Sequence, residues 1–320
     1  MTKARAGLVA IAIVSSCGLW ILARQPVELT AAPQDTTTAA PAGQRAQGGG
    51  QRGRGAGRGA ARTRKVVLAW ADTRNGQAQH DSVSHALAVI ERLGYESGAY
   101  DTFIRTDSNI ISRSPLKTTG QPASGGPNLN NVDAIFFMGH RDVPLDEAQK
   151  GELLSFIRDE GKGFVAAHVG LTAFESWPEF GELLGARFDG HPVNGPGTVV
   201  NEDPAFPATK HFPAAFDFTD EFYQPKEYSR DKIHVLLRLD LANVAPGPSL
   251  HRPDRDYPLA WAKTYGKGRV FYGSFSHAAA TWDIRDVQQM YFEAIKWALG
   301  STDAVLKPHP MTTAATTPSR

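Results

Sequence analysis

Short apolar runs alternate with amphipathic stretches in the middle of this chain, and this alternation limits the folds open to it. Residues 65–71 and 132–138 are almost continuously apolar, as expected of strands that are buried on both faces of a sheet. Helical patterns follow at residues 80–93 and 145–160, where apolar side chains recur on one face. This order predicts an α/β fold, with a parallel sheet and helices on both of its faces.

The segment from residue 161 to residue 192 is the most informative stretch for function. An apolar strand pattern at residues 164–167 ends at His168, and a helix-like pattern is predicted from 174 to 184. A side chain at such a strand-to-helix turn projects from the carboxyl edge of the sheet, where open α/β folds bind ligands. His191 follows between a glycine and a proline. We therefore interpret this segment as half of an active site.

The second half of the chain is predicted to be richer in β-structure. Residues 186–239 are less regular and contain many prolines. Two strands are expected at 258–263 and 269–272, joined by a Gly-containing turn, and a final helix is expected at 285–299.

The N-terminal residues predict export from the cytoplasm. Residues 1–24 combine a basic start with an apolar run, which is typical of a signal peptide or a single membrane anchor. Cys17 also lies in a lipoprotein-like context, although the residues after it are apolar. Residues 25–64 are rich in Gly, Arg and Pro and predict a disordered linker. The folded domain is therefore expected in the periplasm or cell envelope, with membrane contact through the N-terminal segment only.

Composition limits the possible functions of the remaining chain. The folded domain is expected at residues 65–300, with a disordered tail at 301–320. The net charge is +1, but the residues before Lys65 are basic and the rest are mildly acidic, so the domain has no charge pattern for nucleic acid. The single cysteine excludes a disulfide framework and a thiolate metal site.

Several short motifs occur in a fixed order between about residues 65 and 300. They are GKGF at 161–164 with His168, Trp177, GARFDGHP at 185–192, PAT at 207–209, DEFY at 220–223, PLAW at 258–261, GKGRVFY at 266–272 and His277. In this series the chain resembles the ThuA-like family, named for trehalose utilisation. The resemblance implies a flavodoxin-like sheet similar to that of class I glutamine amidotransferases. It also implies a role in bacterial sugar or glycoside utilisation, often beside oxidoreductases that make 3-keto sugars.

The chain departs from the amidotransferase pattern at its catalytic positions. His168 stands where those relatives have a nucleophilic cysteine, and His277 is followed by two alanines, so the glutamate of their His-x-Glu motif is missing. Glutamine hydrolysis through a thioester is therefore excluded. Within the ThuA-like pattern, Phe206 and Tyr257 replace usual histidines, and Ser276 replaces a usual glycine.

The remaining polar residues suggest acid–base chemistry on a sugar. His168, His277, Glu221 and His191 are the candidate catalytic residues. Histidines titrate near neutral pH, so one can accept a proton while another donates one. Our preferred mechanism is proton abstraction alpha to the carbonyl of a keto sugar, with His168 or Glu221 as the base. Its outcome would be isomerisation, or elimination of the glycosidic bond.

Five further residues are candidates for holding the sugar. They are Asp72, His80, His140, Tyr223 and Trp282. Three of them also have a purely structural alternative: a surface position at a helix start for His80, and packing in the interior for Tyr223 and Trp282.

Two other functions remain open at this stage. Several histidines with one carboxylate would suit Zn²⁺ in a metal-dependent hydrolase. We place this below acid–base catalysis, because no HxxxH or HxH spacing is present. No cofactor is firmly implied. The second alternative is a non-catalytic, envelope-tethered module that binds a small sugar or glycoside.

Overall fold

The computed structural model describes residues 63–242, 244 and 247–311. The predictions for residues 1–24, for Cys17 and for almost all of the linker lie outside the described residues. No helix in the described ranges is long and apolar enough to cross a membrane.

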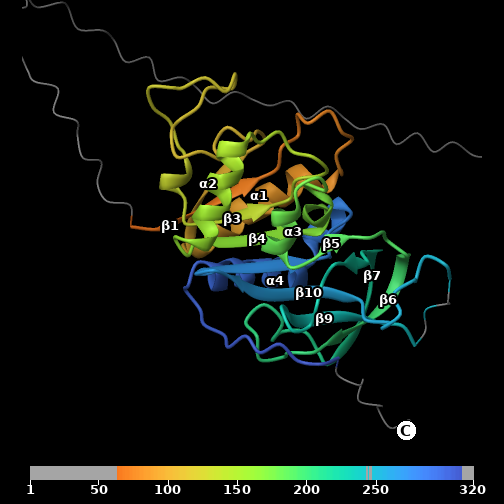
Figure 1. Cartoon of the computed structure of the whole chain (residues 1–320). Coiled ribbons are helices and arrows are strands. Elements are labelled where there is room, and N and C mark those ends of the chain that lie inside the picture. Colours follow the sequence, from red (N-terminus) through yellow and green to blue (C-terminus); the bar gives the residue numbers. More distant parts are fainter. Residues whose placement is uncertain (1–62, 243, 245–246, 312–320) are drawn as a thin grey trace, which may run out of the picture. The chain divides into compact units, whose positions relative to one another are not determined.

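The parallel part of the sheet has the strand order expected of a flavodoxin-like fold (Figure 1). The order is β2-β1-β3-β4-β11, and all neighbours in it pair in parallel. These strands are β1 (Lys65–Trp70), β2 (Tyr100–Arg105), β3 (Ala134–Phe137), β4 (Gly163–Ala167) and β11 (Gly268–Gly273). The predicted α/β class is confirmed for this part.

Four antiparallel strands extend the same sheet beyond β11, so the sheet is mixed rather than parallel throughout. The order continues β10-β9-β6-β7. These are β10 (Pro258–Tyr265), β9 (His234–Asp240), β6 (Val193–Asn201) and β7 (Ala215–Phe222). The turn between β10 and β11 is too short for a helical crossover, and a short turn joins antiparallel neighbours. A separate two-stranded sheet pairs β5 (Arg187–Phe188) with β8 (Pro225–Lys226).

Helices cover both faces of the parallel strands, as predicted. Helices α1 (Ser82–Ser97) and α4 (Arg285–Ala298) pack together on one face. Helices α2 (Glu147–Arg158) and α3 (Pro178–Leu184) cover the other. An apolar core lies on each face of the sheet, and alternate residues of β1 pack into one or the other. Val67 and Ala69 face α1, and Leu68 and Trp70 face the other side.

The residues after β4 do not form the continuous helix predicted from 174 to 184. His168–Thr172 forms a 3-10 helix, η2, and α3 begins only at Pro178. Phe174 between them has a φ of 54°, which is incompatible with a right-handed helix. Proline favours the first turn of a helix, because it has no N–H to leave unpaired there. Two further 3-10 helices are η1 (Leu129–Asn131) and η3 (Ala279–Asp283).

The folded part continues past the predicted boundary at Gly300. The Arg269 guanidinium donates to the Thr302 carbonyl (2.9 Å) and to Asp303 (2.7 Å). The His234 ring contacts the Lys307 carbonyl at 2.7 Å. The sequence between 301 and 311 therefore packs against the antiparallel strands, and 312–320 lie outside the described residues.

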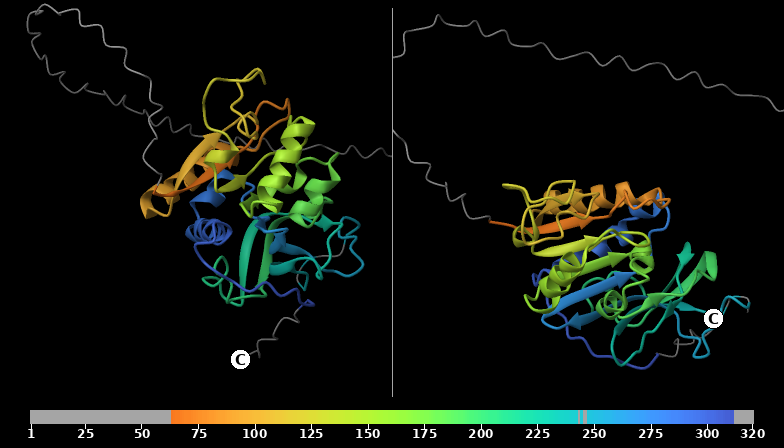
Figure 2. Two further views of the ribbon diagram at one scale, coloured as in Figure 1. Left: turned by 60° about the vertical axis from the view of Figure 1, so that its left-hand side comes forward. Right: turned by 45° about the horizontal axis from the view of Figure 1, so that its top comes forward.

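The strands rotate progressively along the sheet, so that the last ones run steeply across the first (Figure 2). As a result, the end of β7 lies beside the loop that follows β11, although three strands separate them in the sheet. The backbone N–H of Tyr223 donates to Ser274 Oγ (3.2 Å) at this contact. This return of β7 brings Glu221 to the carboxyl ends of the parallel strands.

Candidate active site at the carboxyl ends of the strands

His168 is the first residue after β4 and is fully buried. Its φ is 38°, a conformation that a non-glycine residue adopts only where the surroundings hold it. Its Nδ1 lies 2.6 Å from the Ser274 carbonyl oxygen, so Nδ1 carries the proton and donates it. The Nε2 atom of His168 therefore presents a lone pair to the residues on its other side.

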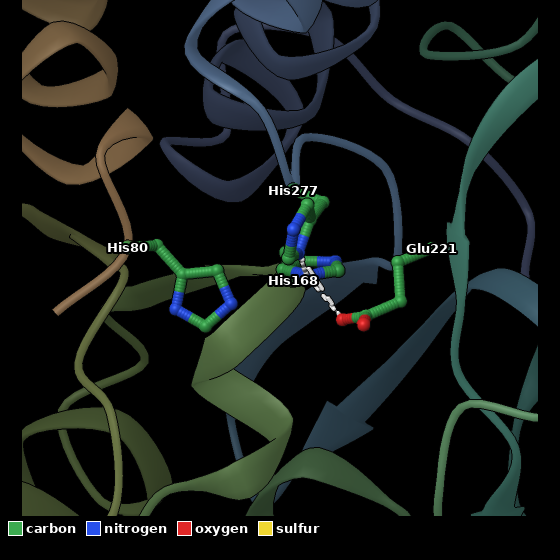
Figure 3. Close-up of side chains that lie close together, drawn as sticks. All are labelled: His80, His168, Glu221 and His277. Atoms are coloured by element: carbon green, nitrogen blue, oxygen red, sulfur yellow. Dashed lines mark hydrogen bonds and ion pairs between the residues drawn. The ribbon is translucent and has the colours of Figure 1, made fainter. Parts of the chain in front are cut away.

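His277 and Glu221 meet this lone pair (Figure 3). His168 Nε2 lies 3.2 Å from His277 Nδ1 and 3.5 Å from Glu221 Oε2. His277 Nδ1 lies 3.1 Å from the same Glu221 oxygen. The three atoms form a nearly regular triangle, built from β4, from the loop after β11 and from β7.

His191 approaches the other oxygen of the same carboxylate. Its Nδ1 is 3.4 Å from Glu221 Oε1, and its side chain is 53% exposed. The His277 side chain is 38% exposed, whereas that of Glu221 is only 9% exposed. Glu221 thus stands between two accessible imidazoles, each of which turns its Nδ1 toward the carboxylate.

His80 and His140 complete the histidine cluster. The ring of His80 packs edge-on against His277 (4.8 Å between centroids), His140 (5.2 Å) and His168 (5.5 Å). Burial, followed by the nearby charges of His168 and His277, lowers the pKa of His80 from 6.5 to about 4. His80 is therefore neutral at physiological pH. His140 Nδ1 lies 2.9 Å from the Ala78 carbonyl, which ties its ring to the loop before α1.

The cluster opens into a hollow of about 450 Å³. The hollow is lined by Ala78, Gln79, His80, Asp81, His140, His277 and Ala278. Another hollow, of about 360 Å³, lies between η2, α3 and β5 and is lined by none of the clustered histidines. The first hollow gives a ligand access to His80, His140 and His277, and His191 is not part of its lining.

The Glu221 carboxylate is ionised at neutral pH. Burial alone would raise its pKa, but the contact with His168 and the charges of His277 and His191 outweigh burial and lower the pKa to about 2. So acidic a group is a weak base. The structure therefore argues against Glu221 as the proton acceptor, and full burial of His168 argues against that residue as a base that touches substrate.

Two of the predicted sugar-binding residues are fully buried by other parts of the chain. Asp72 is fully buried and accepts hydrogen bonds from Arg74 N (2.8 Å) and Ser108 Oγ (2.7 Å). Trp282 is fully buried and stacks on Tyr291 with 4.9 Å between centroids. Neither side chain has a free surface for a sugar, so we do not retain them as binding residues.

Tyr223 contacts the cluster from the buried side of His168. It is 3% exposed, and its ring packs on His168 at 4.2 Å and on Phe188 at 4.7 Å. Burial raises the pKa of its hydroxyl further above its ordinary value. Tyr223 therefore supports the His168 ring and offers no stacking face to a sugar.

Asp220 was not among the site residues predicted from the sequence. This buried carboxylate accepts the backbone N–H groups of Ser276 (2.7 Å) and His277 (3.2 Å). Ser276 has a φ of 103°, in the region that favours glycine. Ser276 stands where the ThuA-like pattern usually has glycine, and this replacement could have served as the signal. A non-glycine residue in a glycine-like conformation needs support from a neighbour, and Asp220 provides it.

The strand order and the position of the cluster together define a class of protein. This is an α/β protein of flavodoxin-like topology, with a histidine–carboxylate site at the carboxyl ends of its parallel strands. The sequence profile of the family described as "ThuA: Trehalose utilisation" matches residues 66–298, and the chain belongs to this family.

Two solved structures have a similar fold. A protein described as ThuA-like from Bacteroides uniformis ATCC 8492 has a TM-score of 0.55 and 20% identity, over 73% of this chain and 91% of that chain. Another, from Parabacteroides merdae ATCC 43184, has a TM-score of 0.54 and 16% identity, over 76% and 93% of the two chains. These similarities show the shared fold. No curated protein was found to match the sequence.

Proposed function

We propose that this chain is an enzyme that removes a proton from the carbon next to the carbonyl of a keto sugar or keto-glycoside. The observation that carries the proposal is the position of Glu221 between His191 and His277. A carboxylate that accepts from Nδ1 leaves Nε2 of each imidazole free for proton transfer, and it stabilises the imidazolium that forms. One histidine then serves as the base and the other as the acid.

The reaction is balanced within the site. The base accepts the proton from the carbon alpha to the carbonyl, and the electron pair of the broken C–H bond forms an enolate. When the enolate collapses toward a glycosidic carbon, the C–O bond breaks and the second histidine protonates the departing oxygen. For isomerisation, the hydroxyl on the deprotonated carbon passes its proton to the enolate oxygen, and the former carbonyl carbon is reprotonated, so that the carbonyl moves to the neighbouring carbon.

The sugar as substrate is supported by the family and by the size of the hollow. The family is described by trehalose utilisation, which associates it with sugars. A hollow of about 450 Å³ is within the range of small-molecule sites.

We also propose that the protein acts outside the cytoplasm. The support is the sequence of residues 1–24 and 25–64, which has the order of an export segment followed by a tether. Protease treatment of intact spheroplasts should digest the domain, whereas a cytoplasmic control protein survives. Protection equal to that of the cytoplasmic control would contradict the proposal.

The test of the reaction is deuterium incorporation. We expect the protein to exchange one hydrogen of a 3-keto disaccharide for deuterium in D2O, or to release a deuterated product, while the unmodified disaccharide is unchanged. His191→Ala and His277→Ala should each slow this exchange at least about a hundredfold.

The control is His85→Ala. His85 is a histidine of α1 that pairs with Asp283 at the surface (2.8 Å), outside the hollow. Its exchange rate should equal that of the wild type. Saturable sugar binding without any exchange would contradict the enzyme and favour the sugar-binding module.

A further inference from the structure

We propose that His168 Nε2, His277 Nδ1 and Glu221 Oε2 bind one divalent transition-metal ion of the zinc type, with His80 as a fourth ligand. The four residues present ligand atoms that all lie within 4.8 Å of one another. This inference goes beyond the proposed function and does not depend on it. An ion on His277 Nδ1 would make that residue a ligand instead of the acid or base, and proton transfer would then fall to His191.

The distances match those between ligands of a tetrahedral ion. Zinc binds histidine nitrogen and carboxylate oxygen at about 2.0–2.2 Å, which places neighbouring ligand atoms about 3.3 Å apart. The three edges of the observed triangle are 3.1, 3.2 and 3.5 Å. A small inward movement of His80 along the line of its ring would complete the fourth corner, since the ring already points at the other three residues (Figure 3).

With His168 neutral, hydrogen bonds alone do not satisfy this triangle. The only ring proton of neutral His168 lies on Nδ1, which contacts the Ser274 carbonyl. His168 Nε2 and Glu221 Oε2 then face each other as two acceptors, with no proton between them. A proton on His277 Nδ1 can point to one of these atoms but not to both. A cation at the centre would satisfy all three atoms.

The charges in the site favour a cation in the same place. Glu221 is buried, and its ion pairs within the described part of the chain are all with histidines. No Lys or Arg among them supplies a permanent positive charge. A buried carboxylate without a fixed counter-charge is costly, and a bound divalent ion removes that cost.

The surroundings are those of a metal site with an open side. A carbonyl that accepts from the distal nitrogen of a metal-bound histidine fixes its tautomer, and Ser274 does this for His168. The inner ligands are buried, whereas His80 and His277 line the hollow. An ion there would meet a water or a sugar oxygen from the hollow. His191 touches the other carboxylate oxygen and remains available for proton transfer.

The test uses the full chain, purified in mild detergent without a histidine tag and stripped with a chelator. We expect it to take up one equivalent of Zn²⁺ with a Kd below about 1 µM, measured by calorimetry. Co²⁺ should give the visible absorption bands of a tetrahedral site with nitrogen and oxygen ligands, and bound Zn²⁺ should raise the thermal midpoint.

Variants distinguish this site from adventitious binding. Glu221→Gln, which keeps the shape of the side chain, and His277→Ala should weaken Zn²⁺ binding at least about a hundredfold, whereas His80→Ala should weaken it less. His85→Ala should bind like the wild type. Melting of the apo-variants by circular dichroism confirms that each is folded before its affinity is compared.

Two results would overturn the inference: less than one tenth of an equivalent bound at 10 µM Zn²⁺, or wild-type affinity in folded Glu221→Gln. Both are read without any sugar. Deuterium exchange in a metal-free protein would leave the proposed function standing, and metal binding without exchange would leave this inference standing.

Discussion

Asp220 Oδ2 accepts a 2.7 Å hydrogen bond from the backbone N–H of Ser276, which joins the end of β7 to the loop after β11. Oδ1 of the same carboxylate accepts from His277 N and from Glu221 N. One buried side chain therefore fixes the relative positions of two residues in the histidine–carboxylate cluster.

Replacing Asp220 by Asn should loosen the cluster, because the amide presents N–H donors to backbone donors. Hydrogen bonds to a charged group contribute about 1.5–3 kcal/mol each, so we expect a loss of about 2 kcal/mol in the free energy of unfolding. Zn²⁺ affinity should fall about tenfold, as when other supports of a metal ligand are removed. Urea denaturation and calorimetry measure the two effects. Asp217→Asn, on an exposed part of β7, is the control, and equal behaviour of the two variants would contradict this role.

Ser276→Gly should stabilise the protein. A non-glycine residue held at a φ of 103° costs about 1–3 kcal/mol, and glycine removes most of this strain. Because glycine also gives the unfolded chain more freedom, we expect a net gain of about 1 kcal/mol in thermal or urea unfolding. Ser155→Gly, inside helix α2, should instead lose about 0.5–1 kcal/mol. A loss of stability in Ser276→Gly would show that the serine side chain matters more than the strain.

The buried ion network around Glu202 should be important for stability. Its side chain is fully buried and pairs with Arg230 (2.6 Å) and Arg238 (2.7 Å). Glu202→Gln removes the carboxylate charge that faces Arg238 and one of the two carboxylates that face Arg230, the other being Asp256, so we expect a loss of about 3–5 kcal/mol. The control is Glu96→Gln in the exposed pair with Arg92, where less than about 0.5 kcal/mol is expected. Losses of equal size in the two variants would refute this ranking.

Acid should remove the contribution of Asp256. Burial would raise the pKa of this carboxyl, but its hydrogen bonds with Arg230 and Tyr228 outweigh burial and hold the pKa below 3.8. A folded pKa below the unfolded value gives stability that is present above about pH 3.8 and is lost as the pH falls through the folded pKa.

Asp256→Asn should therefore be less stable than the wild type at pH 7, and the difference should be smaller at pH 3. Urea denaturation at these pH values measures it. A difference that stays constant with pH would show that the asparagine is penalised for its shape and not for its missing charge.

The parallel half of the fold could be read from local patterns. Buried parallel strands are apolar throughout, and the helices between them show one apolar face, so β1, β3, β4 and α4 were predicted close to their observed bounds. His168 could be placed for the same reason, since the residue after such a strand lies at the carboxyl edge.

Local sequence patterns did not predict which side chains are buried, or where the helix after His168 begins. Trp282 has an aromatic ring that could stack on a sugar. In the structure, however, its ring is covered by Phe136 and Tyr291, which lie elsewhere in the sequence. The helix expected at 174–184 begins only at Pro178, because Phe174 turns into the left-handed region.

The amino-acid sequence by itself determined the α/β class, the strand that carries His168 and the family motifs, because these depend on patterns only a few residues long. The candidate residues were named from the sequence, but only the tertiary structure decided how Glu221 contacts His168, His191 and His277. These contacts depend on the twist of the sheet, which brings the end of β7 beside the end of β11. The twist accumulates over the pairings of all the strands between them. A pattern of a few residues cannot predict this accumulated twist.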